Sequence, residues 1–391
     1  MILSNCRLVS CLSGGIETGT YNVEIKDGKI AGITSMKLAG GDVTDCGGKT
    51  LLPGLIDLHT HITGLRGAEA SDMKTPLKAM AVTCELTGRY LDYGFTAIRD
   101  CGSFDRIANY VRDMTASCIV EGPDIISCGL ILTPTETEAS DGLIPMYSEA
   151  DSPDEFRKAV RREIAEHADY IKIMASGSAF HPQGIPKQPI MTSGELKAIV
   201  EAAAMKDKYV AAHCHADSAI RMCIENGVKT IEHATYISSA TLDILQRKED
   251  CWLVPTLAAM YVSHPEGEEG SFWIKRLGEM LTDCTANIEA AYRRGLKLGF
   301  GTDSTVGMDQ YEQGLEFRYR KELCHMSDVD IIKQATVYNA EIAGLAGHKG
   351  EIKPGCDADL ILVDGKPDVD ISVMYHKPVK VWKSGKLVRG N

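Results

Sequence analysis

The stretch LLPGLIDLHTHITG, residues 51–64, ends in two histidines, His59 and His61, that are separated by one residue. Side chains on a strand alternate between its two faces, so both imidazoles point the same way. The preceding residues 54–58 are nearly all apolar, which is typical of a strand that is covered on both faces. Two imidazoles aimed at one point favour a site for zinc or a similar divalent ion. A chance pair, with one ring bonded to a nearby carbonyl, is the alternative that this stretch leaves open.

Further runs of apolar and β-branched residues follow along the chain. They span residues 96–102, 124–130, 170–177, 209–215, 230–235, 252–257 and 296–304. Segments with helical spacing lie between them, among them residues 75–93 and 193–206, and Ser193 is a candidate N-cap of the second. Eight strands that alternate with helices predict an α/β fold, specifically a (β/α)8 TIM barrel.

The two ends of the chain have a different pattern, with short alternating strands around turns at Asp27-Gly28 and Ser384-Gly385. Each end is too short for a sound hydrophobic core of its own. We therefore predict that residues 1–50 and 349–391 join in one small β-sandwich, with the barrel of residues 51–348 inserted between them. Two independent end domains are the alternative.

Composition narrows the class of protein. The chain has 391 residues, 44% of them hydrophobic, and a net charge of −12, which argues against nucleic acid and anionic membranes as partners. No apolar run reaches the length of a membrane span, and the N-terminus lacks the features of a signal peptide. The 13 cysteines include no Cys-x-x-Cys pair. We expect a cytoplasmic protein with a small-molecule substrate; the sequence leaves a homo-oligomer open.

Polar side chains recur where the predicted strands end, and in a barrel these ends carry the chemistry. They are His59, His61, His213, His215, His233 and Asp303, with Lys172 inside a further strand. Taken singly, each has a structural explanation: His233 as a satisfied core histidine, for example, or Asp303 as a helix cap. Their gathering at one end of a barrel favours a shared metal site.

A lysine inside a buried strand is costly unless it is neutralised or paired. Lys172 has three interpretations: an ion pair with an acid on a neighbouring strand, such as Asp100; a Schiff-base nucleophile; or a carbamate formed with carbon dioxide. A carbamate has two anionic oxygens, and it can bridge two cations as a carboxylate does.

Together these residues resemble the amidohydrolase superfamily, as does the tail EIKPGCDADLILVD. Four stretches are similar to the branch of Xaa-Pro and Xaa-Arg dipeptidases and imidazolonepropionase-related hydrolases: YIKIMASG, VAAHCHADSAI, VKTIEHATYI and GFGTDS. The resemblance covers nearly the whole chain.

The resemblance implies a binuclear centre, with zinc as the metal, that activates water to hydrolyse an amide bond. By motif, His59, His61 and Asp303 would hold one ion and His213 and His233 the other, with Lys172 carboxylated by CO2 as the bridge. His215 falls outside this ligand set. Asp303 would carry the proton to the leaving nitrogen, and Tyr236 would contact substrate near the carbonyl; a tyrosine packed on the rim is the alternative for Tyr236. The implied substrate is a dipeptide or an N-acyl amino acid.

The sequence departs from the dipeptidase pattern in one loop. Residues 132–140, LTPTETEAS, lack the histidine that this branch presents to substrate after the third strand. His181 is a candidate replacement, and an ordinary loop histidine is the alternative. The departure leaves a cyclic amide, as in imidazolonepropionase-like hydrolases, open as the substrate.

Two other functions remain as rivals. A deaminase of the same fold would carry a glutamate three residues after His213, where this chain has Ala216, and would lack the strand lysine. A non-catalytic barrel would normally have lost some of the metal ligands. No Gly-x-Ser-x-Gly motif supports a serine hydrolase.

Overall fold

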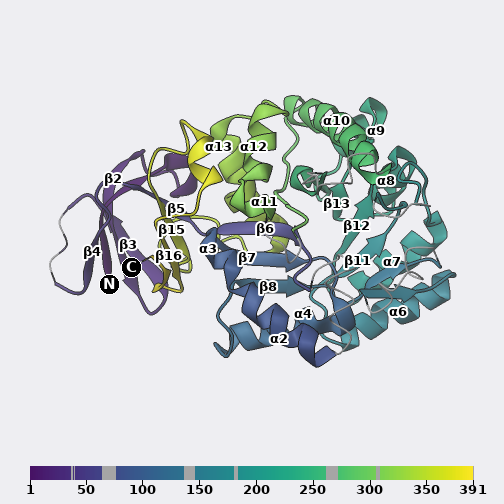
Figure 1. Cartoon of the computed structure of the whole chain (residues 1–391), viewed down its shortest axis with the longest axis horizontal. Coiled ribbons are helices and arrows are strands. Elements are labelled where there is room, and N and C mark those ends of the chain that lie inside the picture. The colour runs from purple at the N-terminus through teal and green to yellow at the C-terminus, as the bar shows by residue number, and fades with distance from the viewer. Residues whose placement is uncertain are drawn as a thin grey trace.

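In the computed structural model, strands from both ends of the chain share one eight-stranded sheet, and both termini lie at this end of the molecule (Figure 1). The order is β17-β16-β15-β5-β1-β2-β3, with β4 beside β1. The strands are β1 (Ile2–Leu8), β2 (Gly19–Lys26), β3 (Lys29–Thr34), β4 (Val43–Asp45), β5 (Thr50–Pro53), β15 (Leu360–Val363), β16 (Lys380–Lys383) and β17 (Lys386–Arg389). Leu3, Val23, Leu360 and Trp382 belong to a hydrophobic cluster that lies within this unit.

The structure describes the chain except for residues 37, 39, 64–75, 136–145, 180–183, 261–271, 305–308 and 391. Both hairpins that the sequence predicts are present. Asp27 and Gly28 join β2 to β3 with φ of 51° and 76°, and Ser384 and Gly385 join β16 to β17 with φ of 47° and 75°. Positive φ at both turn residues matches the twist of paired antiparallel strands.

The larger body is built on parallel strands that form two further sheets. One has the order β6-β7-β8 and the other β10-β9-β11-β12-β13-β14. Their bounds are β6 (Leu55–Thr60), β7 (Phe95–Asp100), β8 (Asp124–Ser127), β9 (Ile131–Thr133), β10 (Tyr147–Glu149), β11 (Ile171–Met174), β12 (Val210–Cys214), β13 (Thr230–His233) and β14 (Trp252–Val254). The chain thus has a mixed α/β fold.

The segment predicted as the eighth strand, residues 296–304, forms isolated bridges instead of a continuous strand. Gly299 N–H donates to the carbonyl of Leu253 in β14 at 2.8 Å, and Leu58 N–H in β6 donates to the Phe300 carbonyl at 3.0 Å. The segment therefore lies between the two parallel sheets. On the other side, the chain passes from β8 into β9, which pairs with β11.

The stretch that contains His59 and His61 differs from the single strand expected. β5 belongs to the small sheet, β6 belongs to the body, and Gly54 separates them. A Cβ at Gly54 would lie 2.1 Å from Oγ1 of Thr96, so only glycine allows β6 to begin this close to β7.

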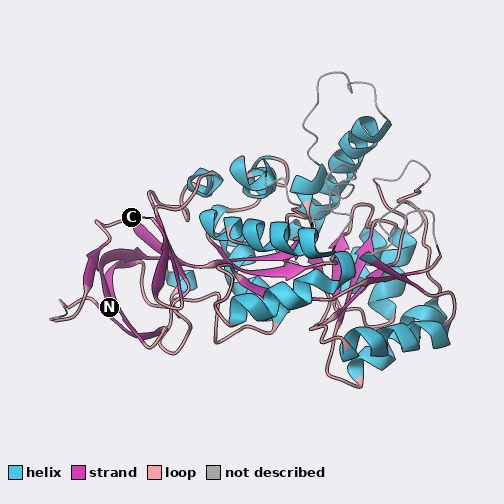
Figure 2. Cartoon of the chain, turned by 60° about the horizontal axis from the view of Figure 1, so that its bottom comes forward, coloured by secondary structure: helices cyan, strands magenta, loops and turns pink. Residues whose placement is uncertain are grey.

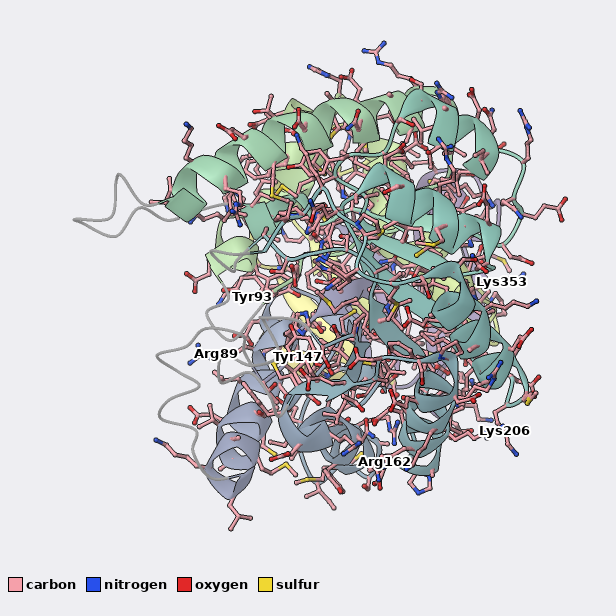
Figure 3. All side chains as sticks on the ribbon, turned by 90° about the vertical axis from the view of Figure 1, so that its right-hand side faces the viewer. Arg89, Tyr93, Tyr147, Arg162, Lys206 and Lys353 are labelled. Carbon is pink, nitrogen blue, oxygen red and sulfur yellow. The ribbon has the colours of Figure 1, made fainter. Side chains whose placement is uncertain are left out.

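Helices cover the outer faces of the parallel strands (Figures 1 and 2). They are α2 (Pro76–Thr87), α3 (Arg89–Asp92), α4 (Ile107–Ala116), α6 (Pro153–Ala165), α7 (Ser193–Ala204), α8 (Asp217–Glu225), α9 (Ser239–Leu245), α10 (Phe272–Arg293), α11 (Asp309–Glu312), α12 (Leu315–Glu322), α13 (Asp328–Lys333) and α14 (Asn339–Ala343). Seen from the end opposite the small sheet, charged side chains such as Arg162 and Lys206 point outward from this layer (Figure 3). Among the described residues, no helix combines the length and hydropathy that crossing a bilayer requires.

The start of α7 differs from the sequence prediction by one residue. The N-cap is Thr192, not Ser193: Oγ1 of Thr192 accepts from the backbone of Glu195, whose carboxylate accepts from the backbone of Thr192. This capping box satisfies two N–H groups at once, which a cap at Ser193 would not achieve here.

Candidate metal centre

The carboxyl ends of the parallel strands bring together the predicted ligand side chains. Two histidines come from the end of β6, Lys172 from β11, His213 from β12 and His233 from β13. Asp303 comes from the bridging segment, where its N–H donates to the His59 carbonyl at 2.7 Å. The side chains are buried, except for His213, which is partly exposed.

His59, His61 and Asp303 form the first group. Oδ1 of Asp303 lies 3.5 Å from Nε2 of His59 and 3.4 Å from Nε2 of His61. One ligand atom from each residue falls within 4.8 Å of the others. A carboxylate and two imidazoles at this spacing are a donor set suited to zinc.

His213, His215 and His233 form the second group. Their ring centroids lie 4.5 Å apart for His213 and His215, 4.6 Å for His213 and His233, and 4.9 Å for His215 and His233. The two groups adjoin, since the rings of His59 and His233 lie 4.8 Å apart. The structure thus brings His215, which the resemblance leaves out, as close as the two predicted ligands.

Lys172 lies beside both groups. Its Nζ is 3.5 Å from Nε2 of His59, and its charge contributes to the lowered pKa values of His61 and His213. The carboxylate of Asp100, the alternative partner considered from the sequence, accepts from the backbone N–H groups of Ile62 and Gly102.

The electrostatics of the cluster suit a cation. Burial lowers the pKa of all five histidines, to about 3 for His61 and His215, so the imidazoles are neutral at physiological pH. Metals bind the neutral imidazole. Two ligand atoms, Nε2 of His213 and Oδ1 of Asp303, are buried without a hydrogen-bond partner among the described residues. Unpartnered buried donors and acceptors are costly, and a bound ion relieves that cost.

The family of the chain follows from comparison with known proteins. The model of the amidohydrolase family matches residues 50–388. The chain belongs to the amidohydrolase family. It is thus a hydrolase that acts on carbon–nitrogen bonds.

Relatives of this amidohydrolase agree with that assignment. An ochratoxinase from Aspergillus niger is 29% identical over 373 residues, which cover 87% of this chain and 76% of the relative. A solved prolidase structure, complexed with N-methylphosphonate-L-proline, is similar with a TM-score of 0.87 and 26% identity over 100% of this chain and 99% of that chain. A Xaa-Pro dipeptidase with bound methionine is similar with a TM-score of 0.87 and 25% identity over the same shares of the two chains.

Each of four histidines in this amidohydrolase has a partner at its Nδ1 atom. For His59 the partner is Glu232 at 2.8 Å, and for His61 it is the carbonyl of Gly102 at 3.0 Å. The partners of the other two are hydroxyl groups, of Thr235 for His215 at 2.8 Å and of Thr256 for His233 at 2.6 Å. With Nδ1 held in this way, Nε2 remains for a ligand role.

Three buried residues near the site were missed from the sequence: Asp57, Arg99 and Glu232. Asp57 accepts from the His59 N–H and from the hydroxyls of Thr302 and Tyr311, so it ties β6 to the bridging segment. Glu232 directly precedes a predicted ligand in a buried strand, which was the available signal. Arg99 lies within the predicted strand 96–102, and a buried cation there requires a partner.

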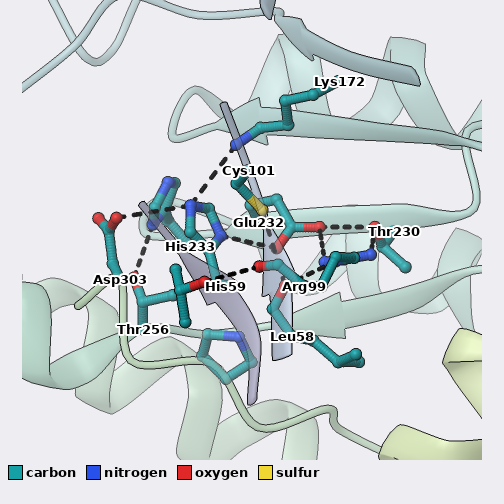
Figure 4. A network of polar contacts seen from close by, with 12 residues as sticks. Leu58, His59, Arg99, Cys101, Lys172, Thr230, Glu232, His233, Thr256 and Asp303 are labelled. Atoms are coloured by element: carbon teal, nitrogen blue, oxygen red, sulfur yellow. Dashed lines mark hydrogen bonds and ion pairs between the residues drawn. The ribbon is translucent and has the colours of Figure 1, made fainter. Parts of the chain in front are cut away.

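A third group of side chains, His59, Cys101 and Glu232, also has metal-ligand spacing, but another side chain of the protein balances its negative charge. The guanidinium of Arg99 lies 2.7 Å from Oε1 of Glu232 and supplies the positive charge (Figure 4). The Tyr170 hydroxyl donates to Sγ of Cys101 at 3.3 Å.

Left-handed backbone occurs at two predicted ligands. His233 has φ of 67° and Asp303 has φ of 55°. Residues other than glycine adopt this region at a cost of about 1–3 kcal/mol, and such strain is concentrated at functional sites. At His233 it ends the regular alternation of β13.

The predicted substrate contacts are only partly described. Tyr236 is half-buried next to the second group: its N–H donates to the His215 carbonyl at 3.0 Å, and Nζ of Lys187 lies 4.4 Å from its ring centroid. Burial, and after it Asp283, raises the pKa of Tyr236 to about 12. His181 and most of the loop of residues 132–140 lie outside the described residues.

Proposed function

We propose that this amidohydrolase uses two divalent metal ions, with zinc as the metal, to hydrolyse the amide bond of a dipeptide or an N-acyl amino acid. The supporting observation is that two groups with metal-ligand spacing adjoin, with the rings of His59 and His233 4.8 Å apart, and that Nζ of Lys172 lies 3.5 Å from Nε2 of His59. A single-metal site needs one such group, whereas this arrangement has two.

In this proposal, His59, His61 and Asp303 hold one ion, and His213 and His233 hold the other. Lys172, carboxylated by CO2, would supply an anionic oxygen to each ion as the bridging ligand. When bound, the two ions lower the pKa of a water molecule and polarise the carbonyl that it attacks. The neutral state of the histidines and the unpartnered Nε2 of His213 support this assignment.

The fold that carries the site is, in the same proposal, a (β/α)8 barrel that runs to residue 348, with a β-sandwich built from both ends of the chain. The first boundary lies at Gly54 and not at residue 50, because β5 belongs to the small sheet. The backbone hydrogen bonds of the segment 298–304 to both parallel sheets support closure of the barrel. In such barrels, active sites lie at the carboxyl ends of the strands, where the ligand groups are found here.

Asp303 is the proposed proton carrier. Burial raises its pKa to about 6, although the charge of Lys172 lowers it. Its carboxylate lies against both histidines of the first group, where it can take a proton from water and return it to the leaving nitrogen.

Tyr236 is the proposed donor to the substrate. With a pKa of about 12 its hydroxyl stays protonated at neutral pH. A phenol held at the entrance of the site donates a hydrogen bond to the carbonyl oxygen, and this bond strengthens as negative charge develops there.

The test is a screen of the metal-loaded protein against four substrate libraries: dipeptides, N-acyl amino acids, cyclic amides and aminated heterocycles. Metal content is measured in the same preparation by mass spectrometry. We expect two ions per chain and cleavage of linear amides. Tyr236→Phe should lower kcat, whereas Tyr110→Phe, which alters an exposed tyrosine on α4, should not.

The other outcomes discriminate among the rivals. Hydrolysis confined to cyclic amides would place the protein with the imidazolonepropionase-like enzymes. Release of ammonia from a heterocycle by a protein that holds one ion would indicate a deaminase and overturn the proposal.

A further inference from the structure

We propose that Arg99 and Glu232 are a positioning pair that fixes the tautomer and orientation of His59, so that Nε2 of His59 faces the metal centre. This inference rests on the proposed function, because it assigns to two other residues a role at the same centre. Neither residue carries a metal ligand atom in the assignment above.

The contact between Glu232 and His59 decides where a proton lies. Oε2 of Glu232 is 2.8 Å from Nδ1 of His59. A carboxylate accepts hydrogen bonds and donates none, so the proton of this contact belongs to Nδ1. Nε2 then has its lone pair free, and it is Nε2 that lies 3.5 Å from both Lys172 and Asp303.

Arg99 holds the carboxylate in place. Its guanidinium donates to Oε1 of Glu232 at 2.7 Å, to the hydroxyl of Thr230 at 3.1 Å and to the Leu58 carbonyl at 2.6 Å (Figure 4). The Thr230 hydroxyl donates to the same carboxylate oxygen at 2.5 Å. One buried cation thus links β7, where it originates, to β13 and to the residue that precedes His59 in β6.

The pair is fully buried, with an exposed fraction of 0% for both side chains. Burying two charges carries a large desolvation cost, and hydrophobic residues of similar volume often replace such pairs without loss of stability. The free energy of folding therefore does not by itself explain a charged pair at this position. The contact of the Glu232 carboxylate with His59 explains the pair, because it gives the negative charge a role at the site.

His59 differs in this respect from the other site histidines. The ring of His61 is held by a neutral carbonyl, and the rings of His215 and His233 are held by hydroxyls, which accept or donate. A carbonyl or a carboxylate fixes the tautomer, and the negative charge of a carboxylate makes the imidazole a stronger electron donor to a metal than a neutral acceptor does. Among the four site histidines with a described Nδ1 partner, His59 alone has a carboxylate; the exposed His325, away from the site, has one in Glu289.

The test is a titration of the metal-free protein with Zn2+ against a competing chromophoric chelator. The wild type should bind two ions. Glu232→Gln should weaken one of the two sites by about 10- to 100-fold and leave the other unchanged, as is typical when the hydrogen-bond partner of a ligand histidine is lost. The double variant R99M/E232Q, which leaves no unpaired buried charge, should weaken the same site.

A matched control separates positioning from general destabilisation. Glu163 in α6 is also 0% exposed and is bonded to an arginine, Arg106, at 2.8 and 2.6 Å. Glu163→Gln should lower the free energy of unfolding and leave both zinc affinities unchanged. The 15N chemical shifts of His59 supply a direct reading, since loss of the Nδ1-protonated state is expected only in the variants at position 232.

The outcomes are distinct for the two proposals. If the wild type binds zinc at two sites and both affinities survive in Glu232→Gln and R99M/E232Q, the pair is structural and this inference is wrong. If the wild type binds no zinc, the proposed function is wrong, and this inference is then wrong as well, because it assigns a role at the same metal centre.

Discussion

At the scale of single residues, Lys172 decides between one and two metal ions. Only 1% of this residue is exposed, and its Nζ lies 3.5 Å from Nε2 of His59, whose ring adjoins that of His233. If its carbamate bridges the ions, Lys172→Ala removes two anionic ligand atoms. The space left by the side chain can then admit a small carboxylate. We expect metal content to fall below two ions per chain, and short carboxylates such as acetate to restore part of it. Mass spectrometry of the dialysed protein measures both effects.

Lys229 provides the control for that experiment. It precedes β13, at the end of the strand away from the site, and its Nζ lies 4.8 Å from the ring centroid of Tyr209. Lys229→Ala should retain full metal content. A Lys172→Ala protein that still holds two ions without added carboxylate would show that the bridge is wrong.

Asp57 predicts a pH dependence of stability. Burial raises the pKa of its carboxyl to about 6, although Thr302 and Tyr311 donate hydrogen bonds that lower it. Between about pH 4 and pH 6, the Asp57 carboxyl therefore keeps its proton in the folded state and has lost it in the unfolded state. Because the folded pKa is the higher one, this group stabilises the fold at low pH, and the contribution is lost as pH rises through 6.

Asp57→Asn removes that titration and keeps a side chain of the same size. The free energy of unfolding of the metal-free wild type, relative to the variant, should fall by roughly 2–3 kcal/mol between about pH 4 and about pH 7. Urea unfolding at a series of pH values measures it. A difference that stays constant, or that rises with pH, would contradict the assignment.

At the scale of elements, the start of α7 tests the hydrogen bonds of the structure against the sequence pattern. Thr192 carries the capping box, whereas the Ser193 hydroxyl lies 3.3 Å from Oδ1 of Asn226 at the surface. Thr192→Ala should cost about 1 kcal/mol of unfolding free energy, as the loss of a cap does. Ser193→Ala should stay within about 0.5 kcal/mol. Equal losses, or a larger loss at position 193, would favour the cap that the sequence predicted.

The strands were predictable from the sequence because burial leaves a simple pattern. The period of two residues is sufficient to place His59 and His61 on one face, and the apolar runs locate the strands around Lys172 and His213. The division at Gly54 was not predictable, since it depends on how closely Thr96 approaches. No local pattern reports a distance between strands.

The surroundings of the ligands were also beyond sequence reasoning. Alternation places Glu232 and His233 on opposite faces, yet the left-handed φ of 67° at His233 lets both serve one site. Arg99 and Glu232 are 133 residues apart in the chain, so nothing in the sequence around either one identifies its partner. Metal ligands are recognisable as residue types at strand ends, whereas their supports are recognisable only in three dimensions.

At the scale of the whole molecule, a cluster of charges joins the small sheet to the body. Lys349 contacts Asp359 of the small unit and, at 2.7 Å, Asp124 at the start of β8. Lys383 of β16 also contacts Asp124, at 2.6 Å. This end of β8 is opposite the ligand groups, so the contacts stabilise the fold without entering the site.

Lys349 should therefore matter for stability and not for metal binding. It is 7% exposed, and its removal leaves a nearly buried carboxylate, that of Asp359, with one cation less. We expect Lys349→Met to lower the free energy of unfolding by about 3 kcal/mol, since breaking a buried pair from one side is costly.

Lys29 provides the exposed control. Its side chain is 50% exposed and pairs at 2.8 Å with Asp357 in the same cluster, so Lys29→Met should cost under about 1 kcal/mol. Denaturant unfolding of both variants measures the difference. Similar losses would mean that burial does not govern this interface, and a loss of zinc in Lys349→Met would mean that the small sheet supports the metal centre after all.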